Sequence, residues 1–242
     1  GDRPRYADPD PPATRHEGDG IGRNAAMSQR MPTRVLLADD HTMVREALAR
    51  ILDETSDIVV VAQARDGREV SDAIQRSAPD VLVLDFTMPH LDPPRDIERL
   101  LGQYPSLKIL VLTVHERAHY ALRALESGAH GYLIKSAASE ELMEAIREVR
   151  AGRVYLSSSI SQDVLARLRT PRDKRSGLEA LSPREFSCLR LLGAGKTLQE
   201  CAREMHVSVS TASTYRGRIM EKLGLDSTAE LIRFALEHDL ST

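Results

Sequence analysis

The chain has 242 residues, of which 41% are hydrophobic and 29% are charged, with a formal net charge of -3 and two cysteines. This length allows one or two domains with a buried core. No apolar stretch approaches the length of a membrane span and the first residues hold no signal-like apolar segment, which excludes a membrane-spanning protein, so we expect a soluble, cytoplasmic protein.

The first segment, residues 1–33, is rich in proline, glycine and charge and holds almost nothing to bury. We expect a disordered leader or a segment added for expression, with Met27 or Met31 as a candidate natural start. The rest of the chain is split in charge: residues 34–150 carry 14 basic and 20 acidic side chains, residues 151–180 carry 6 and 3, and residues 181–242 carry 8 of each. This is a weak charge signal for nucleic acid, so the last part has to be judged from its pattern.

Four short apolar runs follow the leader, and each ends in a polar residue. They are RVLLADD at 34–40, DVLVLD at 80–85, KILVLT at 108–113 and GYLIK at 131–135. A segment with helical periodicity follows each run, which predicts a parallel sheet with helices on both faces. In such sheets the functional groups gather at the carboxyl ends of the strands.

Three carboxylates should therefore meet at one edge of the sheet, those of Asp39, Asp40 and Asp85. Converging carboxylates repel one another and raise at least one pKa unless a divalent cation joins them. Mg²⁺ suits such a site because it takes hard oxygen ligands and usually keeps several waters. Lys135 would supply a compact positive charge for a phosphoryl oxygen, and Thr113 would supply a hydroxyl. The pattern predicts a Mg²⁺ site that handles phosphate.

These residues resemble the receiver domain of response regulators. The matching segments are ADDH at 38–41 and LDFTMP at 84–89, followed by Thr113, Tyr132 and Lys135. The resemblance covers about residues 34–153 and implies a flavodoxin-like, doubly wound α/β fold with a five-stranded parallel sheet.

The resemblance also implies roles for the acidic residues. Asp85 would be the phosphoacceptor, taking a phosphoryl group from a sensor histidine kinase. Asp40 would bind Mg²⁺ directly, and Asp39 would bind it directly or through water. The backbone carbonyl of Thr87 would complete the protein ligands. Such a protein is no enzyme beyond, at most, removing its own phosphoryl group.

In the same family a threonine and a lysine contact the phosphoryl group, which places Thr113 and Lys135 in these roles. Thr113 and Tyr132 fall where the family has its switch pair, a hydroxyl pulled toward the phosphoryl group and a ring that follows it inward. Phosphorylation would add about -1.5 to -2 charges and shift an existing equilibrium toward a DNA-competent form, expected to be a homodimer.

Three residues depart from the family's pattern. Pro93 stands where a glycine is common and Pro94 follows it, so the loop leaving the acceptor should be stiffer and should lack a hydrogen bond. Val114 follows Thr113 where a smaller residue is common, and it could narrow access to the phosphoryl group. These changes put the rates of phosphorylation and dephosphorylation in doubt and remove no reacting atom.

Other interpretations remain open at this point. Each pocket residue alone has an ordinary structural explanation, such as a turn or helix cap for an Asp-Asp pair. A regulator whose receiver works without phosphate is one alternative. A Mg²⁺-dependent aspartyl phosphohydrolase is another, although the haloacid-dehalogenase type needs an acid where Thr87 stands.

The last part of the chain has the pattern of a helix-turn-helix domain over residues 181–242, joined by a linker at 154–180 that contains a helix and a basic segment. The segment LSPREFSCLRLLGAG opens on Ser182 and Pro183, a helix cap and a first-turn proline, and stops at glycine. LQECAREMH forms a second helix, and a third ends at Gly224. Cys188 and Cys201 should be small buried apolar residues.

The third helix of this part, STASTYRGRIMEKLG, has two different faces. Its apolar face carries Ala212, Tyr215, Ile219 and Leu223, which should pack inward. The opposite face is small and polar and is flanked by basic residues, as expected of a recognition helix in the major groove. The candidate DNA-binding residues are Ser210, Thr211, Ser213, Thr214, Tyr215, Arg216, Gly217, Arg218 and Lys222.

The stretches LSPRE and GKTLQECAREMHVSVSTASTYRGRIMEKLG resemble the LuxR-type DNA-binding domain that closes NarL/FixJ-type response regulators. The resemblance covers about residues 181–240 and implies an all-α, four-helix domain that binds an operator, expected to have two half-sites. The alternative is a plain helical bundle. Leu231, Phe234 and Ala235 form an apolar stripe on the last helix, which is a candidate dimer surface or a part of the core.

Overall fold

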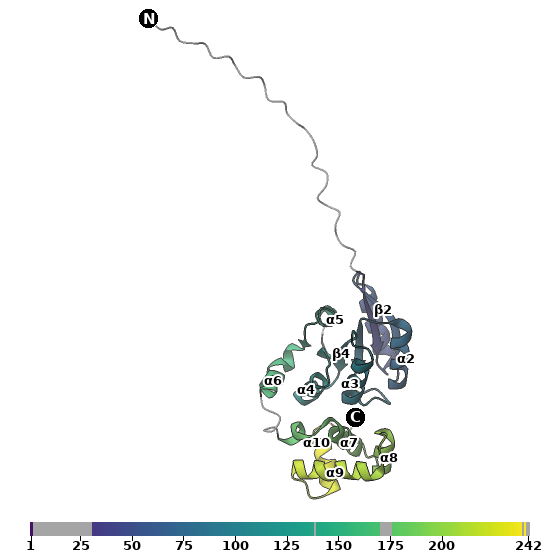
Figure 1. The fold of residues 1–242 in the computed structure, drawn as a ribbon, viewed down its shortest axis with the longest axis vertical. Helices are drawn as coiled ribbons and strands as arrows, with labels where there is room; N and C mark the ends of the chain where they lie inside the picture. Colours follow the sequence, from purple (N-terminus) through teal and green to yellow (C-terminus); the bar gives the residue numbers. More distant parts are fainter. Residues whose placement is uncertain (2–30, 138, 170–175, 239, 241–242) are drawn as a thin grey trace. The chain divides into compact units, whose positions relative to one another are not determined.

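Six parallel strands form one sheet in the computed structural model of the protein, which describes residues 1, 31–137, 139–169, 176–238 and 240 (Figure 1). The strand order is β2-β1-β3-β4-β5-β6, so the direction of winding reverses between β1 and β3. Nearly all of the leader and part of the basic linker, residues 170–175, lie outside the described residues. The strands are β1 (Thr33–Ala38), β2 (Ile58–Ala64), β3 (Val81–Asp85), β4 (Lys108–Thr113), β5 (Gly131–Ile134) and β6 (Tyr155–Leu156).

The expected count of five strands is corrected to six by the short edge strand β6. It pairs in parallel with β5, with Gly131 opposite Tyr155 and Tyr132 opposite Leu156. A strand of two residues has no alternation that a sequence pattern could reveal, because its only support is pairing with a distant segment. It lies inside the range 154–180 that the sequence predicts as a linker.

Five helices cover the two faces of the sheet, as the alternation of apolar runs predicts. Val35 and Leu37 point to the face that packs against α1 and α5, whereas Leu36 and Ala38 point to the face of α2, α3 and α4. Successive strand residues face opposite sides, so both faces of each central strand are buried. The helices are α1 (Thr42–Asp53), α2 (Gly67–Ser77), α3 (Pro93–Gln103), α4 (Ala118–Glu126) and α5 (Ser139–Arg150).

The loop between β3 and α3 is held closely against α2. The backbone N–H of Gly67 donates to the carbonyl of Pro89, at 3.0 Å, and a Cβ on Gly67 would come within 2.6 Å of the His90 carbonyl oxygen. Only glycine allows this approach. Pro93 and Pro94 are the first residues of α3, where a missing N–H costs no helical hydrogen bond, so they start the helix instead of stiffening the loop.

The last part of the chain is helical, as expected. It contains α6 (Ser158–Leu168), the 3-10 turn η2 (Gly177–Ala180), α7 (Pro183–Gly193), α8 (Leu198–Glu204), α9 (Val209–Leu223) and α10 (Thr228–Glu237). Ser182 caps α7 in a capping box with Glu185, and Gly224 ends α9 in the left-handed conformation at φ 65°. Both cysteines are free and buried. None of the helices in the described residues is long and apolar enough to cross a membrane.

The apolar stripe on α10 lies in the core of this helical region. Leu231 and Ala235 are fully buried and Phe234 is half-buried. Because a fully buried side chain has no free surface for a second chain, Leu231 and Ala235 fit the core interpretation, whereas half-buried Phe234 keeps some exposed surface. The large apolar side chain that α10 exposes is Leu236.

The helical region packs against the sheet region through α7, and the two form one compact unit. The hydroxyl of Ser187 donates to the Asp92 carboxylate, and the guanidinium of Arg190 donates to the carbonyl of Leu91 at 3.3 Å. Asp92 and Leu91 belong to the loop that follows Asp85, so this loop lies between the acidic edge of the sheet and α7.

His119 of α4 is a buried histidine at this contact and predicts a pH dependence of stability. It is 7% exposed, and its ring centroid lies 4.4 Å from that of Tyr120 and 6.2 Å from that of Phe186. Its Nε2 has no hydrogen-bond partner among the described residues. Burial, together with the positive charge of Arg123, lowers the pKa of His119 to about 3.

Because an unfolded histidine titrates near pH 6.5, the unfolded chain binds a proton below that pH that the folded chain does not bind. The free energy of unfolding should therefore fall as the pH falls, by about 2 kcal/mol from this residue at pH 5. Urea unfolding at pH 7 and pH 5 should show this loss in the native protein and a smaller loss in His119→Phe. An equal loss in both proteins would contradict the assignment.

Candidate functional site

The predicted acidic pocket is present at the carboxyl edge of the sheet. The ammonium of Lys135, just after β5, lies 2.7 Å from Asp39 Oδ2 and 2.8 Å from Asp85 Oδ2. Asp39 and Asp85 are almost fully buried, whereas Asp40 is half-buried. The three aspartates and the lysine come from three different strand ends, and the parallel pairing of β1, β3, β4 and β5 brings them together.

Charge balance holds this arrangement together. Burial disfavours the charged form of Lys135, but hydrogen bonds to Asp39 and Asp85 outweigh it and raise the pKa of Lys135 above its ordinary value. The backbone N–H of His41 donates to Asp39 Oδ1 at 2.8 Å, and the backbone N–H of Thr87 donates to Asp85 Oδ1 at 3.1 Å. Each buried carboxylate thus meets the Lys135 ammonium with one oxygen and a backbone N–H with the other.

The donor set fits a small divalent cation. Ligand atoms of Asp39, Asp40, His41 and Asp85 all lie within 4.8 Å of one another. The carboxylate oxygens are the hard donors that Mg²⁺ prefers. His41 Nδ1 lies 2.9 Å from Asp40 Oδ1, and sequence reasoning did not assign His41 a role although it belongs to the ADDH segment.

Thr87 also approaches Asp85 with its side chain. Its hydroxyl donates to Asp85 Oδ1 at 3.0 Å, so the side chain and backbone of one residue share one carboxylate oxygen. The other oxygen is bonded to Lys135. Asp85 is therefore oriented by donors on both sides, and a negatively charged group that joins this carboxylate would lie close to the Lys135 ammonium.

Thr113 and Tyr132, the predicted switch pair, are connected through one residue. The Thr113 hydroxyl accepts from the backbone N–H of His115 at 3.2 Å, and the Tyr132 hydroxyl donates to the carbonyl of His115 at 2.9 Å. Both are fully buried, and burial raises the pKa of Tyr132 well above its ordinary value. Val114, which lies between Thr113 and His115, is 62% exposed. A displacement of Thr113 would therefore change the hydrogen bond to His115 and, through His115, the position of the Tyr132 ring.

The helix α9 carries a small polar face on the surface of the protein. Ala212 and Ile219 are buried as expected, and Tyr215 and Leu223 are half-buried. Ser208 caps the helix by accepting from the backbone N–H of Thr211 at 3.1 Å. The other candidate DNA-binding side chains are exposed or half-buried: Ser210, Ser213, Thr214, Arg216, Gly217, Arg218 and Lys222.

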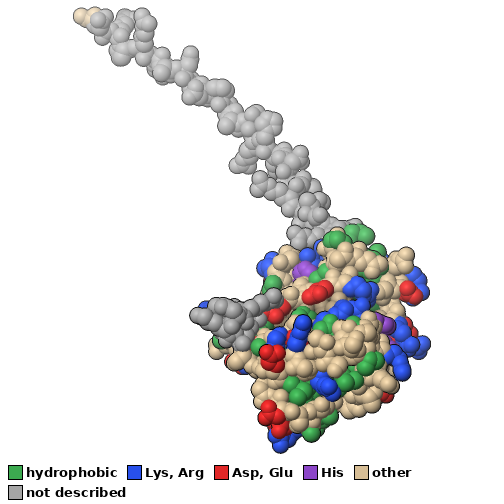
Figure 2. Space-filling model, turned by 60° about the horizontal axis from the view of Figure 1, so that its bottom comes forward, with side chains coloured by type: hydrophobic (Ala, Val, Ile, Leu, Met, Phe, Trp, Pro, Cys, Tyr) green, Lys and Arg blue, Asp and Glu red, His purple; other side chains and the backbone are tan. Residues whose placement is uncertain are grey.

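Among the described residues, basic side chains do not form one continuous block on the face that Figure 2 shows. In Figure 2, which turns the lower side of Figure 1 forward, Lys and Arg lie between neutral and acidic side chains. This mixed surface agrees with the balanced charge of residues 181–242. Any recognition of nucleic acid by α9 must depend on a few placed side chains more than on total charge.

Lys222, one of the candidate DNA-binding residues, is held by an ion pair within the chain. Its ammonium lies 2.6 Å from Glu185 Oε2, and Glu185 also accepts from the backbone N–H of Ser182 at 2.7 Å. Burial disfavours the Glu185 carboxylate, but the hydrogen bonds from Lys222 and Ser182 and the charge of Lys222 together outweigh it and lower the pKa of Glu185. The pair fastens the C-terminal turn of α9 to the start of α7.

Two family models match the chain, one over each part. The model described as the response regulator receiver domain matches residues 35–147, and the model of bacterial regulatory proteins of the luxR family matches residues 179–235. The acidic pocket lies in the first range and α9 lies in the second.

Single relatives match both parts of the chain together. Response regulator GacA of Pseudomonas aeruginosa is 33% identical over 207 residues, which cover 86% of this chain and 97% of that protein. Oxygen regulatory protein NreC of Staphylococcus aureus is 33% identical over 217 residues, which cover 86% of this chain and 98% of that protein. The structure of RcsB from Salmonella enterica serovar Typhimurium, bound to promoter rprA in the presence of phosphomimetic BeF3-, has a TM-score of 0.68 at 25% identity and covers 84% of this chain and 98% of that chain.

The internal pair of Lys222 and Glu185 predicts a stability effect. In Lys222→Met the carboxylate of Glu185 stays buried without its ammonium, so the free energy of unfolding should fall by about 1–3 kcal/mol. The double variant Glu185→Gln/Lys222→Met should recover part of this loss, because glutamine can still accept from the Ser182 N–H in the capping box. Urea unfolding measures both. Equal losses in the single and double variants would show that the unpaired charge is not the cause.

Proposed function

Because the chain belongs to the response regulators that join a receiver to a LuxR-type DNA-binding domain, we propose that it is a transcriptional regulator controlled by phosphorylation of Asp85. The observation that supports this most directly is the Asp85 carboxylate, buried between Lys135 and the Thr87 donors at the carboxyl edge of the sheet. The donor would be a sensor histidine kinase.

In the proposed reaction an Asp85 carboxylate oxygen attacks the phosphorus of a phosphohistidine on the kinase. A P–O bond forms, the P–N bond breaks, and the histidine nitrogen keeps the electron pair and can take up a proton. Lys135 would offset the negative charge of the phosphoryl oxygens, because it already binds Asp85 Oδ2. Bound Mg²⁺, held by Asp39, Asp40, Asp85 and the Thr87 carbonyl, would neutralise charge on the carboxylates and phosphoryl oxygens.

The phosphoryl group would act on the rest of the protein through Thr113. The Thr113 hydroxyl oxygen accepts from the backbone N–H of His115. Its hydroxyl proton would be donated to a phosphoryl oxygen, which is a strong, charged acceptor. Because Tyr132 is bonded to His115 as well, a shift of Thr113 would change the surroundings of the tyrosine ring. We propose that this coupled shift favours a DNA-binding form that is a homodimer.

The helix α9 is the proposed recognition helix. Its N-terminal hydroxyls, Ser210 and Thr211, and the exposed Arg218 would contact phosphates, while Ser213, Thr214 and Gly217 would face the bases. Lys222 is a weaker phosphate contact in this proposal because Glu185 already neutralises it. The operator would contain two half-sites, and the protein would act in the cytoplasm. The enzymatic activity that we propose is limited to, at most, the removal of its own phosphoryl group.

Phosphorylation at Asp85 can be tested by mass. Incubation of the full-length protein with Mg²⁺ and acetyl phosphate should add the mass of one phosphoryl group, and Asp85→Asn should abolish the addition because it removes the nucleophilic carboxylate. Asp163→Asn, which changes an exposed aspartate of α6, is the matched control and should be labelled like the native protein. Undiminished labelling of Asp85→Asn would exclude Asp85 as the acceptor.

Base contact at Gly217 makes a separate prediction for DNA binding. Gly217 lies in the interior of α9, and a Cβ there would meet no heavy atom within 4 Å. Gly217→Leu should therefore stabilise the free protein by up to about 1 kcal/mol through helix propensity. It should also weaken binding to a duplex that the native protein selects from a random pool, by about 10-fold, because the new side chain occupies the space of the bases.

Gly102→Leu is the matched control, because Gly102 is also a helical glycine whose added Cβ would meet no heavy atom within 4 Å, but it lies in α3. It should leave affinity for the selected duplex unchanged. Scrambled duplex should bind all three proteins about equally. If Gly217→Leu weakens binding to selected and scrambled duplexes by the same factor, α9 does not read bases in the proposed orientation.

A further inference from the structure

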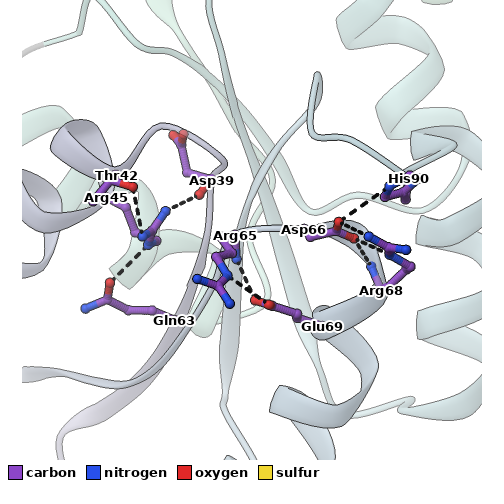
Figure 3. Close-up of polar contacts among 9 residues, drawn as sticks. All are labelled: Asp39, Thr42, Arg45, Gln63, Arg65, Asp66, Arg68, Glu69 and His90. Atoms are coloured by element: carbon purple, nitrogen blue, oxygen red, sulfur yellow. Dashed lines mark hydrogen bonds and ion pairs between the residues drawn. The ribbon is translucent and has the colours of Figure 1, made fainter.

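A buried arginine lies behind the acidic pocket and has no role in the function proposed above. Arg45 of α1 is only 9% exposed. Its Nη1 donates to the backbone carbonyl of Asp39 at 2.6 Å, its Nε donates to Gln63 Oε1 at 3.1 Å, and its Nη2 lies 3.5 Å from the hydroxyl of Thr42, as Figure 3 shows. The guanidinium thus joins the end of β1, the end of β2 and the start of α1.

The three acceptors of Arg45 are uncharged oxygens. Burying a guanidinium without a carboxylate at close range costs desolvation free energy. The position of Arg45 therefore has to be explained by the backbone and side-chain groups that it holds in place. The planar fork of an arginine fixes the directions of its donors, which a flexible ammonium cannot do. The shortest of the three contacts is the one to the Asp39 carbonyl.

The Asp39 carbonyl belongs to the peptide that connects the two acidic residues. Asp39 is also held by other groups: its N–H donates to the carbonyl of Ala64 at 3.0 Å and its carboxylate meets Lys135. Asp40 is different, because its carboxylate is half-exposed and contacts the exposed His41. Apart from this contact, Asp40 Oδ1 has no hydrogen-bond partner among the described residues, so the fixed group next to this side chain is the peptide before it, which Arg45 holds.

We propose that Arg45 is a positioning residue for Asp40 and that it sets the Mg²⁺ affinity of the pocket through the Asp39–Asp40 peptide. The inference rests on the proposed Mg²⁺ site of the receiver. Arg45 does not touch the metal in this proposal. It keeps the carboxylate of Asp40 directed toward the position where the carboxylates of Asp39 and Asp85 converge.

Positioning and simple electrostatics predict opposite signs. The guanidinium is a positive charge near a cation site, so a purely electrostatic role means that its removal strengthens Mg²⁺ binding. A positioning role means that its removal weakens binding, because the Asp40 carboxylate then samples directions in which it cannot be a ligand. Mutations of groups that orient metal ligands typically weaken metal binding by 10-fold to 100-fold.

The test is a calorimetric Mg²⁺ titration of the full-length protein, which does not depend on phosphorylation. Arg45→Met keeps the length of the side chain and should weaken Mg²⁺ binding by about 10-fold. Arg45→Lys should recover part of the affinity, since an ammonium can reach one carbonyl without forming the fork. Arg50→Met is the matched control: it removes the same charge from an exposed position of α1 and should leave the affinity unchanged.

A double-variant cycle tests whether Arg45 acts through Asp40. In an Asp40→Asn background, Arg45→Met should cause little further loss of Mg²⁺ affinity, because the ligand that it orients is already absent. Gln63→Leu removes the exposed acceptor that holds the guanidinium and should weaken binding several-fold. Arg45→Lys and Gln63→Leu decide the question if Arg45→Met fails to fold, which thermal unfolding will show.

The possible results separate this inference from the proposed function. Stronger or unchanged Mg²⁺ binding in Arg45→Met, or independent losses in the cycle, would overturn the positioning role while leaving the metal site intact. Absence of Mg²⁺ binding in the native protein would overturn the metal site and the positioning role together. The positioning role of Arg45 would be supported by weaker Mg²⁺ binding in Arg45→Met and Gln63→Leu, partial recovery in Arg45→Lys and no change in Arg50→Met.

Discussion

The ammonium of Lys135 between the carboxylates of Asp39 and Asp85 is the interaction on which the arrangement of the pocket depends. It allows two almost fully buried carboxylates to lie side by side at one edge of the sheet, where they would otherwise repel each other. The lysine can do this because β5 lies next to β4 in the sheet and its backbone N–H donates to the carbonyl of Thr113 at 2.7 Å. A phosphoryl group and Mg²⁺ would enter a site whose charges are already partly balanced.

The pocket is supported from two sides that behave differently. On one side the loop after β3 is fixed by its close approach to Gly67, where the N-cap Asp66 also lies 3.7 Å from His90 (Figure 3). This loop continues to Asp92, which contacts Ser187 of α7, so a change at the acceptor has a short structural route to the helical region. On the other side Arg45 holds the peptide between the two acidic residues. Fixed supports of this kind keep ligand and acceptor geometry within narrow limits.

In the helical region, polar contacts decide which side chains remain available to a partner. Glu185 completes the cap of α7 and neutralises Lys222, so one of the basic residues on α9 serves the interior of the domain. Ser210, Thr214 and Gly217 of the same helix are left on the surface, and the glycine has no neighbour that requires its lack of a side chain. Glycine in the interior of a helix lowers helix stability. Its presence in α9 is best explained by a partner that approaches the helix closely, as DNA does in the proposed function.

The sequence by itself determined the parallel sheet, the helical region and the residues of the pocket, because apolar periodicity, helix caps and polar residues at strand ends are local patterns. Parallel pairing then requires those strand ends to meet. Only the tertiary structure decided the sixth strand, the burial of Leu231 and Ala235, the pairing of Lys222 with Glu185 and the place of Arg45. These depend on contacts between segments that are distant in the sequence, such as Glu185 and Lys222, 37 residues apart. A local pattern shows that a residue lies on a helix, but the packing of that helix decides whether its side chain meets solvent, the core or a partner.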